Sequence, residues 1–416
     1  MLEARTQRPW SGKEPLRLFI VAGEHSGDLL GGKLLAALQR RLPGDLELSG
    51  VGGESMVAEG LTSLFPMSDV AVMGFVEVAR HLPGIVRRAY RTIDAALAFD
   101  PHVVVVIDSP DFTHPIAKRI RRRRPDIPIV DYVSPTVWAW RPGRARKMAA
   151  YTDHLLALLP FEPEAHARLG GPPCTYVGHP IVERLQEFKS ADAAGLAARI
   201  GISALKPSVV VLPGSRRGTI RRLLPDFTRA LELLTRQVGP LELLLPTVPE
   251  RVAQLEQATS DWPIRPRILL GEADKLAAYR LARAALAASG TVTLELAVAG
   301  TPAVVAYRVG PLVHQLRHFI EFKVPSIVLP NLILGENVYP EFVETSVVPE
   351  RMAAALAPLL SDTSERAAQL AALRRIAGRL APPSSSPSEA AADIVLDLAR
   401  RGRGEARAAL SSRPGA

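Results

Sequence analysis

A single glycine-flanked turn near the start of the chain, GEHSGD at 23–28, carries two carboxylates, an imidazole and a hydroxyl. It follows a strand-like apolar run, and helix-like sequence resumes near Leu29, so Ser26 and Asp28 are suited to cap a helix. Glu24 comes at the carboxyl end of the predicted strand, where open α/β sheets bind ligands. We therefore expect Glu24 to contact a substrate. The plainer alternative is strand, turn and cap, with Glu24 merely solvated.

Two further carboxylates follow the apolar run VVVVI at 103–107. Asp108 and Asp111 flank Ser109-Pro110, and the proline biases Ser109 towards an extended backbone. A pair of carboxylates at a strand end indicates one acid or base and one structural partner. For Asp111, the alternative is that it only caps the next helix.

Two turns in the second half of the chain are typical of phosphate sites. Gly-Ser-Arg at 214–216 and Ser-Gly-Thr at 289–291 each stand between a strand-like and a helix-like segment, where amides and the helix dipole favour an anion. The first is not a Walker P-loop, because no Gly-Lys-Ser/Thr ending follows. Glu295, one turn into the second helix, is placed to hold ribose hydroxyls. Together the turns predict a nucleotide diphosphate site.

The loop YVSPTVWAWRPGRARKM at 132–148 combines tryptophans with a cluster of cations. Trp138 and Trp140 either pack beneath the domain or stack on a ligand. The cations either form a solvated face or meet phosphate, and the sequence leaves both questions open.

The elements that must position these residues alternate between strand and helix. Strand-like runs at 16–23, 102–110, 128–135 and 154–161 are separated by helical patterns, and a second series begins after Pro207. This alternation predicts an α/β fold with two doubly wound Rossmann-like domains facing each other across a cleft. We place the first domain at 16–185, the second at 186–380, and a tail with one helix and a disordered end at 381–416.

Composition narrows the class of protein. The chain has 416 residues, 47% of them hydrophobic, so large cores are available, and its one cysteine excludes a disulfide framework or a cysteine-cluster metal site. The net charge of +9 favours an anionic partner, but aromatic residues at 5% argue against nucleic acid. No apolar run has the length of a signal peptide core or a membrane span. We expect a cytoplasmic protein whose membrane contact is peripheral.

As a set, these stretches resemble lipid-A-disaccharide synthase, a nucleotide-sugar glycosyltransferase of the two-domain GT-B type. The matching segments, in the expected order over roughly residues 18 to 345, are IVAGEHSGD, GVGGESM, AVMGFVEV, DSPDF, YVSPTVWAWR, LPFE, VGHP, LPGSR, ASGTVTLE and PNLILGENVYPEF. The resemblance implies that UDP-2,3-diacylglucosamine donates its sugar to 2,3-diacylglucosamine 1-phosphate. The products are UDP and a β-1,6-linked disaccharide, with inversion at the anomeric centre and neither bound metal nor other cofactor.

The resemblance also implies roles for individual residues. Asp111 matches the general base, Glu24 a residue that orients a sugar, and Arg216 the arginine that meets the diphosphate. The substrate-binding residues it implies are Gly23, Ser26, Gly27, Asp108, Gly214, Ser215, Ser289, Gly290, Thr291, Glu295, Asn331 and Glu341. Two positions depart from the family pattern: His25, where a small residue is common, and Glu344, where a glutamine is common.

An acylated substrate resists leaving the bilayer, because each buried CH₂ contributes about 0.8 kcal/mol. The segment 67–91 could bring the enzyme to it, since an apolar group is followed there by arginines; the alternative is an ordinary core helix with a basic end. The residues expected to contact acyl chains or membrane are Val72, Met73, Phe75, Val76 and Leu82.

The resemblance implies the two acylated sugars and an anionic membrane surface as partners, on the cytoplasmic face of the inner membrane. It also allows a homodimer that exchanges C-terminal segments. The nearest rival function is another GT-B enzyme of envelope synthesis, either a UDP-N-acetylglucosamine transferase or an epimerase. A peripheral membrane protein that keeps a nucleotide fold without catalysis is a further alternative, against which Asp111, Glu24 and Arg216 argue.

Overall fold

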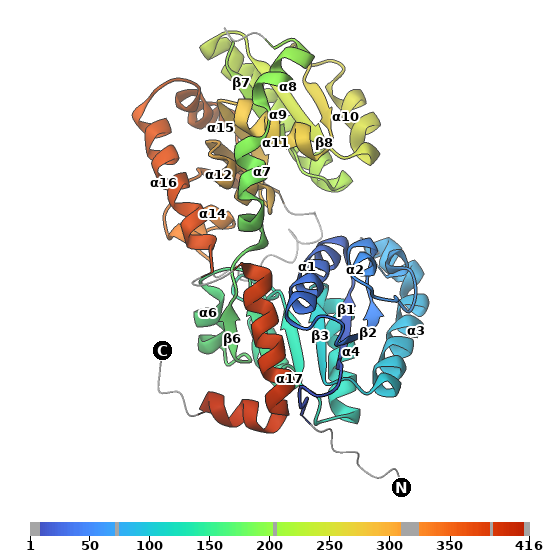
Figure 1. Cartoon of the computed structure of the whole chain (residues 1–416). Coiled ribbons are helices and arrows are strands. Elements are labelled where there is room, and N and C mark those ends of the chain that lie inside the picture. Colours follow the sequence, from blue (N-terminus) through green and yellow to red (C-terminus); the bar gives the residue numbers. More distant parts are fainter. Residues whose placement is uncertain (1–8, 71–74, 203–205, 309–323, 383–385, 412–416) are drawn as a thin grey trace. The chain divides into compact units, whose positions relative to one another are not determined.

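The computed structural model describes residues 9–70, 75–202, 206–308, 324–382 and 386–411 (Figure 1). The chain forms two compact units, one of Met1–Pro180 with Ala381–Ala416 and one of Ile181–Leu380. The tail therefore belongs to the first unit, although the sequence analysis treated it as a separate region.

The first domain is built on a parallel sheet of six strands in the order β2-β1-β3-β4-β5-β6. Their bounds are β1 (Leu16–Ala22), β2 (Leu46–Val51), β3 (Val103–Ile107), β4 (Ile129–Tyr132), β5 (His154–Ala157) and β6 (Cys174–Tyr176). The predicted strands form β1, β3, β4 and β5. The two that the sequence analysis missed, β2 and β6, are the edge strands of this sheet.

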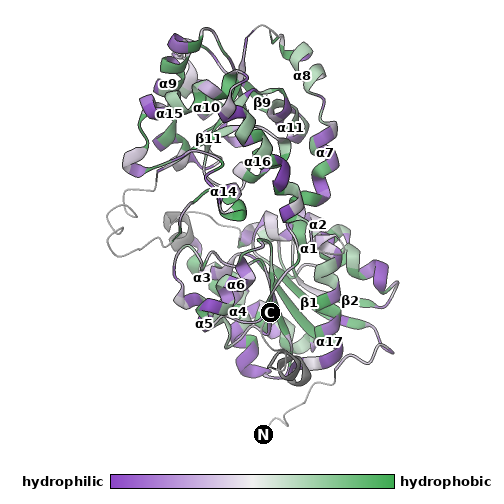
Figure 2. Cartoon of the chain, turned by 90° about the vertical axis from the view of Figure 1, so that its left-hand side faces the viewer, coloured by the Kyte–Doolittle hydropathy of each residue, from purple (hydrophilic) through white to green (hydrophobic). Residues whose placement is uncertain are grey.

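Helices cover both faces of this sheet, as the doubly wound prediction requires. They are α1 (His25–Arg41), α2 (Glu54–Ala58), α3 (Phe75–Phe99), α4 (Pro110–Arg123), α5 (Gly143–Met148), α6 (Glu162–Leu169) and α17 (Pro387–Ser411). Successive residues of a strand point to opposite faces. In β1, Leu18 and Ile20 join a core with α1 and α17, while Phe19 and Val21 join a core with α3 and α4. Figure 2 shows the resulting pattern of hydrophobic strands under helices of mixed hydropathy.

The last helix, α17, packs against α1 of the same domain. Leu396 and neighbouring apolar residues enter the α1 core, and Arg41 is paired with Glu389 and, at 2.8 Å, with Asp393. The expectation of disorder over the last dozen residues was wrong in part, because α17 runs through a kink at Gly402 to Ser411.

The second domain repeats the architecture with a sheet of six parallel strands in the order β12-β11-β10-β7-β8-β9. The strands are β7 (Ser208–Leu212), β8 (Glu242–Thr247), β9 (Arg267–Leu270), β10 (Ala284–Ala288), β11 (Ala303–Tyr307) and β12 (Glu341–Val343). The helices are α7 (Leu185–Ser190), α8 (Ala193–Ile200), α9 (Arg217–Val238), α10 (Val252–Thr259), α11 (Glu272–Leu281), α12 (Val292–Ala299), α14 (Leu329–Leu334), α15 (Pro349–Leu356) and α16 (Ser364–Leu380). The prediction of two Rossmann-like domains is confirmed.

Each sheet has one place where the order of strands reverses. In the first domain the chain moves from β1 to β2 and then returns to place β3 on the other side of β1. In the second it moves from β7 through β8 to β9 and then places β10 on the other side of β7. Open α/β sheets bind ligands at the carboxyl ends of the strands that flank such a reversal. Both groups of predicted site residues follow these strands.

Candidate active site

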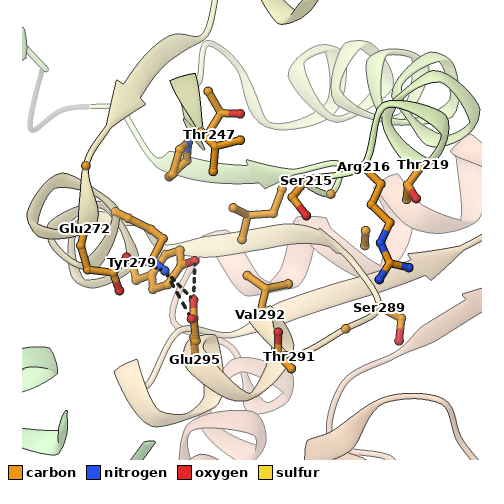
Figure 3. A pocket seen from close by; sticks show the side chains of 18 of the residues that line it. Ser215, Arg216, Thr219, Thr247, Glu272, Tyr279, Ser289, Thr291, Val292 and Glu295 are labelled. Carbon is orange, nitrogen blue, oxygen red and sulfur yellow. Dashed lines mark hydrogen bonds and ion pairs between the residues drawn. The ribbon is translucent and has the colours of Figure 1, made fainter. Parts of the chain in front are cut away.

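A pocket of about 670 Å³ opens in the second domain at the reversal between β7 and β10 (Figure 3). Its lining includes every nucleotide-site residue predicted from the two phosphate-type turns, namely Gly214, Ser215, Arg216, Ser289, Gly290, Thr291 and Glu295. Residues far apart in the sequence therefore share one concave site of a size that suits a small ligand.

The turn at 214–216 is shaped by a glycine and leads directly into α9. Gly214 has a φ of 107°, a backbone conformation that side chains disfavour, and Arg216 is the N-cap of α9. Arg251 supports the turn by donating from Nε to the carbonyl oxygen of Ser215 at 2.9 Å. Figure 3 shows the exposed guanidinium of Arg216 extending towards the turn that carries Ser289.

The second turn, at 289–291, precedes α12 and is tethered by its serine. Ser289 Oγ donates to the carbonyl oxygen of Ile327 at 2.7 Å, so this hydroxyl holds a neighbouring segment in place. Within the described residues, the amides of Gly290 and Thr291 have no acceptor. Such amides at a helix N-terminus are ready donors for an anion.

Glu295 forms the other end of the pocket, together with two residues of α11. Its carboxylate lies 3.1 Å from Lys275 Nζ and accepts a hydrogen bond of 3.1 Å from the hydroxyl of Tyr279. Lys275 also pairs with Glu272 at 2.9 Å. A carboxylate has about four lone-pair sites, so Glu295 retains acceptor capacity for a ligand hydroxyl. Burial and Glu295 together raise the pKa of Tyr279, which keeps its hydroxyl a donor.

Lys275 was missed by the sequence analysis. Its signal was the spacing of Glu272, Lys275 and Tyr279 at i, i+3 and i+7, which puts the three on one face of a helix that begins after β9.

Asn331 and Glu341 are not among the residues that line the pocket. The buried Asn331 bonds the backbone of Tyr339 twice, accepting from its N–H and donating to its carbonyl oxygen, each at 2.9 Å. Glu341 accepts from the hydroxyl of Ser326 and the amide of Ile327. Ile327 is also the residue held by Ser289. Glu341 thus holds the residue that Ser289 contacts, and direct contact of Asn331 or Glu341 with a donor stays a prediction.

In the first domain, Ser26, Asp108 and Ser109 meet at the reversal between β1 and β3. Ser26 Oγ donates to Asp108 Oδ2 at 3.2 Å, and Asp108 Oδ1 accepts from the Ser109 amide at 2.8 Å. The expectation of an extended Ser109 was wrong, since Asp108 and Ser109 have φ values of 51° and 45°. Non-glycine residues held there cost roughly 1–3 kcal/mol each and cluster at functional sites.

Gly23 is required by close packing against this strained turn. A Cβ at residue 23 would lie 2.8 Å from Ser109 Cβ, while one at Gly27 would lie 3.2 Å from the carbonyl oxygen of Ile107. The Ser109 hydroxyl is buried and has no partner within the part of the chain that the structure describes. It is a buried polar group beside Gly23.

The start of α1 differs from the prediction. The helix begins at His25, which is exposed, and Glu24 is its N-cap without a side-chain cap bond. Asp28 is fully buried and accepts from the amides of Gly53 at 2.7 Å and Ser55 at 2.9 Å, so it caps α2 instead of α1. This leaves the half-buried carboxylate of Glu24 available at the strand end.

Asp111 stands in the first turn of α4, with its side chain 89% exposed. The N-cap of α4 is Ser109 and makes no side-chain cap bond, so the capping alternative for Asp111 does not hold. Its carboxylate Oδ1 instead accepts from Arg144 Nη2 of α5 at 3.0 Å. One arginine of the basic cluster is therefore an ion-pair partner of the proposed base.

The tryptophan loop rests on a buried polar network. Trp138 packs edge-on against Phe161 with ring centroids 5.1 Å apart, and its Nε1 donates to Glu162 Oε1 at 3.2 Å. Trp138 therefore packs within the domain. Burial raises the pKa of Glu162 to about 7. Burial also lowers the pKa of His166, whose Nε2 lies 2.8 Å from Ser134 Oγ, to about 4.

The residues expected to meet acyl chains fall around the start of α3. Val72 and Met73 lie outside the described residues, and Phe75 and Val76 begin α3 without a description of their side chains. Leu82 is exposed, as are two later α3 residues one and two turns on, Val86 and Tyr90.

No cluster of three or more histidine, cysteine, aspartate or glutamate side chains placed to hold a metal ion occurs among the described residues. Nor does any described helix combine the length and apolarity needed to cross a membrane.

The model of the lipid-A-disaccharide synthetase family matches residues 18–395. Lipid-A-disaccharide synthase of Nitrobacter hamburgensis is 49% identical over 388 residues, which cover 93% of this chain and 97% of the relative. The enzyme of Nitrobacter winogradskyi is 50% identical over 387 residues, covering 93% and 96%. Among solved structures, the fold is similar to that of UDP-GlcNAc 2-epimerase from Neisseria meningitidis bound to UDP-GlcNAc, with a TM-score of 0.59 and 10% sequence identity. The match covers 92% of this chain and 99% of the epimerase chain. That likeness shows the fold alone. The chain belongs to the lipid-A-disaccharide synthase family and is a glycosyltransferase of lipid A biosynthesis.

Proposed function

We propose that the protein transfers the sugar of UDP-2,3-diacylglucosamine to the 6-hydroxyl of 2,3-diacylglucosamine 1-phosphate. The glycosidic bond to UDP breaks, the β-1,6 bond forms, and the hydroxyl proton leaves with a base. The observation that carries the proposal is the pocket of the second domain, in which the turns at 214–216 and 289–291 and the carboxylate of Glu295 converge.

In this proposal the diphosphate lies against the amides of 214–216 and of Gly290 and Thr291, and Arg216 pairs with it. Negative charge grows on the departing UDP as the sugar becomes oxocarbenium-like, and preformed donors stabilise such charge without reorganisation. Glu295 accepts from the ribose hydroxyls. Because Lys275 and Tyr279 hold its carboxylate at about 3 Å, it does not need to be ordered when the nucleotide binds.

The acceptor sugar lies in the first domain at the strand ends that carry Glu24 and Asp108. Asp111 takes the proton of the attacking hydroxyl, a role that contributes typically about 10²–10⁴-fold in rate. Glu24 orients the sugar. The reaction requires this site and the donor pocket to meet during turnover.

The exposed side of α3 is proposed to meet the membrane. Leu82, Val86 and Tyr90 follow one another at a spacing of four residues, so they lie on one face of the helix, and their exposures are 51%, 44% and 43%. The exposed Arg87 and Arg91 adjoin them, and basic side chains near an anionic surface contribute about 1 kcal/mol each. In this proposal the enzyme acts peripherally, on the cytoplasmic face of the inner membrane.

Vesicle sedimentation tests the membrane proposal. Leu82→Ser with Val86→Ser is expected to reduce binding to anionic vesicles, whereas Val57→Ser, which removes an equally exposed apolar side chain from α2, leaves binding unchanged. Equal binding by the wild type and the double variant would exclude this surface. A homodimer stays a prediction that sedimentation velocity can test.

The reaction is tested by measuring UDP release and disaccharide formation with acylated and unacylated UDP-glucosamine. The proposal predicts product only when acylated donor and acceptor are both present. Turnover of UDP-N-acetylglucosamine, by transfer or by epimerisation, would favour the rival envelope enzymes instead.

A further inference from the structure

The ion pair between Arg144 and Asp111 joins two groups whose surroundings differ sharply. The side chain of Arg144 is 22% exposed and that of Asp111 is 89% exposed, with Nη2 and Oδ1 3.0 Å apart. The arginine is therefore held by the body of the domain, and the carboxylate reaches it from solvent. An ion pair of this kind adds little to stability, since water screens the exposed partner.

The exposed side of Arg144 is suited to an anion stronger than a carboxylate. Guanidinium groups bind phosphate through two parallel N–H···O bonds, and such charge-assisted bonds are shorter and stronger than ordinary ones. A phosphate that replaces Asp111 would therefore give Arg144 hydrogen bonds at least as strong as those it loses. The exposed carboxylate, once displaced, is free to turn towards another group.

More positive charge lies beside Arg144. Arg141 and Lys147, three residues before and after Arg144, are exposed, and within the described residues neither has a carboxylate partner. The guanidinium of Arg141 lies over the ring of Trp140, 4.3 Å from its centroid, which keeps this cation beside the loop. These cations make the potential around Arg144 more positive.

We infer that Arg144 binds the 1-phosphate of the acceptor and, in doing so, releases Asp111 to act on the acceptor hydroxyl. The inference rests on the proposed function, because it assigns the base to Asp111. One sugar ring separates the phosphate from the 6-hydroxyl, so an acceptor anchored at Arg144 carries its hydroxyl past the displaced carboxylate. Without that phosphate, the Asp111 carboxylate stays hydrogen-bonded to Arg144 and is not turned towards the acceptor hydroxyl.

The test compares diacylglucosamine 1-phosphate with the same acceptor lacking phosphate. Arg144→Gln is expected to raise the KM for the phosphorylated acceptor about 10- to 100-fold, the loss of one charged hydrogen-bonding partner, with kcat changed far less. For the acceptor without phosphate, kcat/KM is expected to stay equal or to rise, since Asp111 is unpaired in the variant. Arg144→Lys keeps the positive charge but loses the pair of parallel N–H donors. Its KM for the phosphorylated acceptor is expected to lie between those of the wild type and Arg144→Gln.

Arg123→Gln is the matched control, because it breaks an exposed arginine–aspartate pair with Asp94 at the other end of α4. Arg123→Gln is expected to leave kcat and KM unchanged for both acceptors. If Arg144→Gln lowers turnover equally with both acceptors, the phosphate assignment is overturned. An active Asp111→Asn enzyme would instead refute the base in the proposed function, whatever the selectivity of the Arg144 variants.

Discussion

Replacing Glu162 by glutamine is expected to change how the stability of the protein depends on pH. Glu162 is buried, its Oε2 accepts from the amides of Leu158 and Leu159, and burial raises its pKa from 4.5 to about 7. Between these values the folded protein binds a proton that the unfolded chain has lost. The folded state is therefore penalised as pH rises from 4.5 to 7, and the penalty is complete above pH 7.

The magnitude follows from the two pKa values. A shift of this size corresponds to about 3 kcal/mol at full effect, of which roughly 2–3 kcal/mol develops between pH 5 and pH 8. Glutamine cannot ionise. From pH 5 to pH 8 the free energy of unfolding of the wild type should therefore fall by that amount relative to Glu162→Gln. The pKa values of His154, His166 and His179 are lowered to about 4 by burial, which costs stability as pH falls below 6.5. That term is common to both proteins and cancels in their difference.

Urea unfolding followed by tryptophan fluorescence at several pH values measures this difference, because Trp138 donates to Glu162. Glu164→Gln, an exposed change on the same helix, is the control and should run parallel to the wild type. A difference between the wild type and Glu162→Gln that stays constant from pH 5 to pH 8 would refute a buried, pH-titrating Glu162.

Three further outcomes follow from the site. Asp111→Asn should lower turnover about 10²- to 10⁴-fold in a steady-state assay and leave UDP affinity unchanged; wild-type turnover would remove Asp111 as the base. Arg216→Ala should weaken UDP binding about 10- to 100-fold by calorimetry, and an unaltered affinity would place the diphosphate elsewhere. Gly23→Ala should impair turnover, because its Cβ would lie 2.8 Å from Ser109 Cβ; full activity in a well-folded variant would show that the turn tolerates displacement.

Much of the fold could be predicted because the central strands are continuous apolar runs. The fully buried β3, VVVVI, has no other good interpretation, and the strands of the second series repeat the pattern. The edge strands β6 and β12 escaped prediction because each has only three residues and is partly exposed, so neither shows a hydrophobic run. The start of α1 was misplaced because Asp28 is a typical capping residue, but it caps a helix that follows much later in the chain.

The donor pocket was predictable because each of its two turns contains a glycine and a hydroxyl side chain and directly follows a predicted strand. What the sequence could not show is which polar side chains face each other. Asn331 and Glu341 have the residue types of ligand contacts, yet both bond backbone behind the pocket. Lys275 has the type of a solvated surface residue, yet it holds the pocket carboxylate. These assignments depend on tertiary contacts between segments that no local pattern specifies.

The most direct test of the account is a crystal structure of the protein with bound UDP. The account predicts diphosphate oxygens within hydrogen-bond distance of the amides at 214–216 and of Gly290 and Thr291, with Arg216 on the phosphates and Glu295 on the ribose hydroxyls. UDP bound away from these turns, or bound there with its diphosphate turned from both, would contradict it.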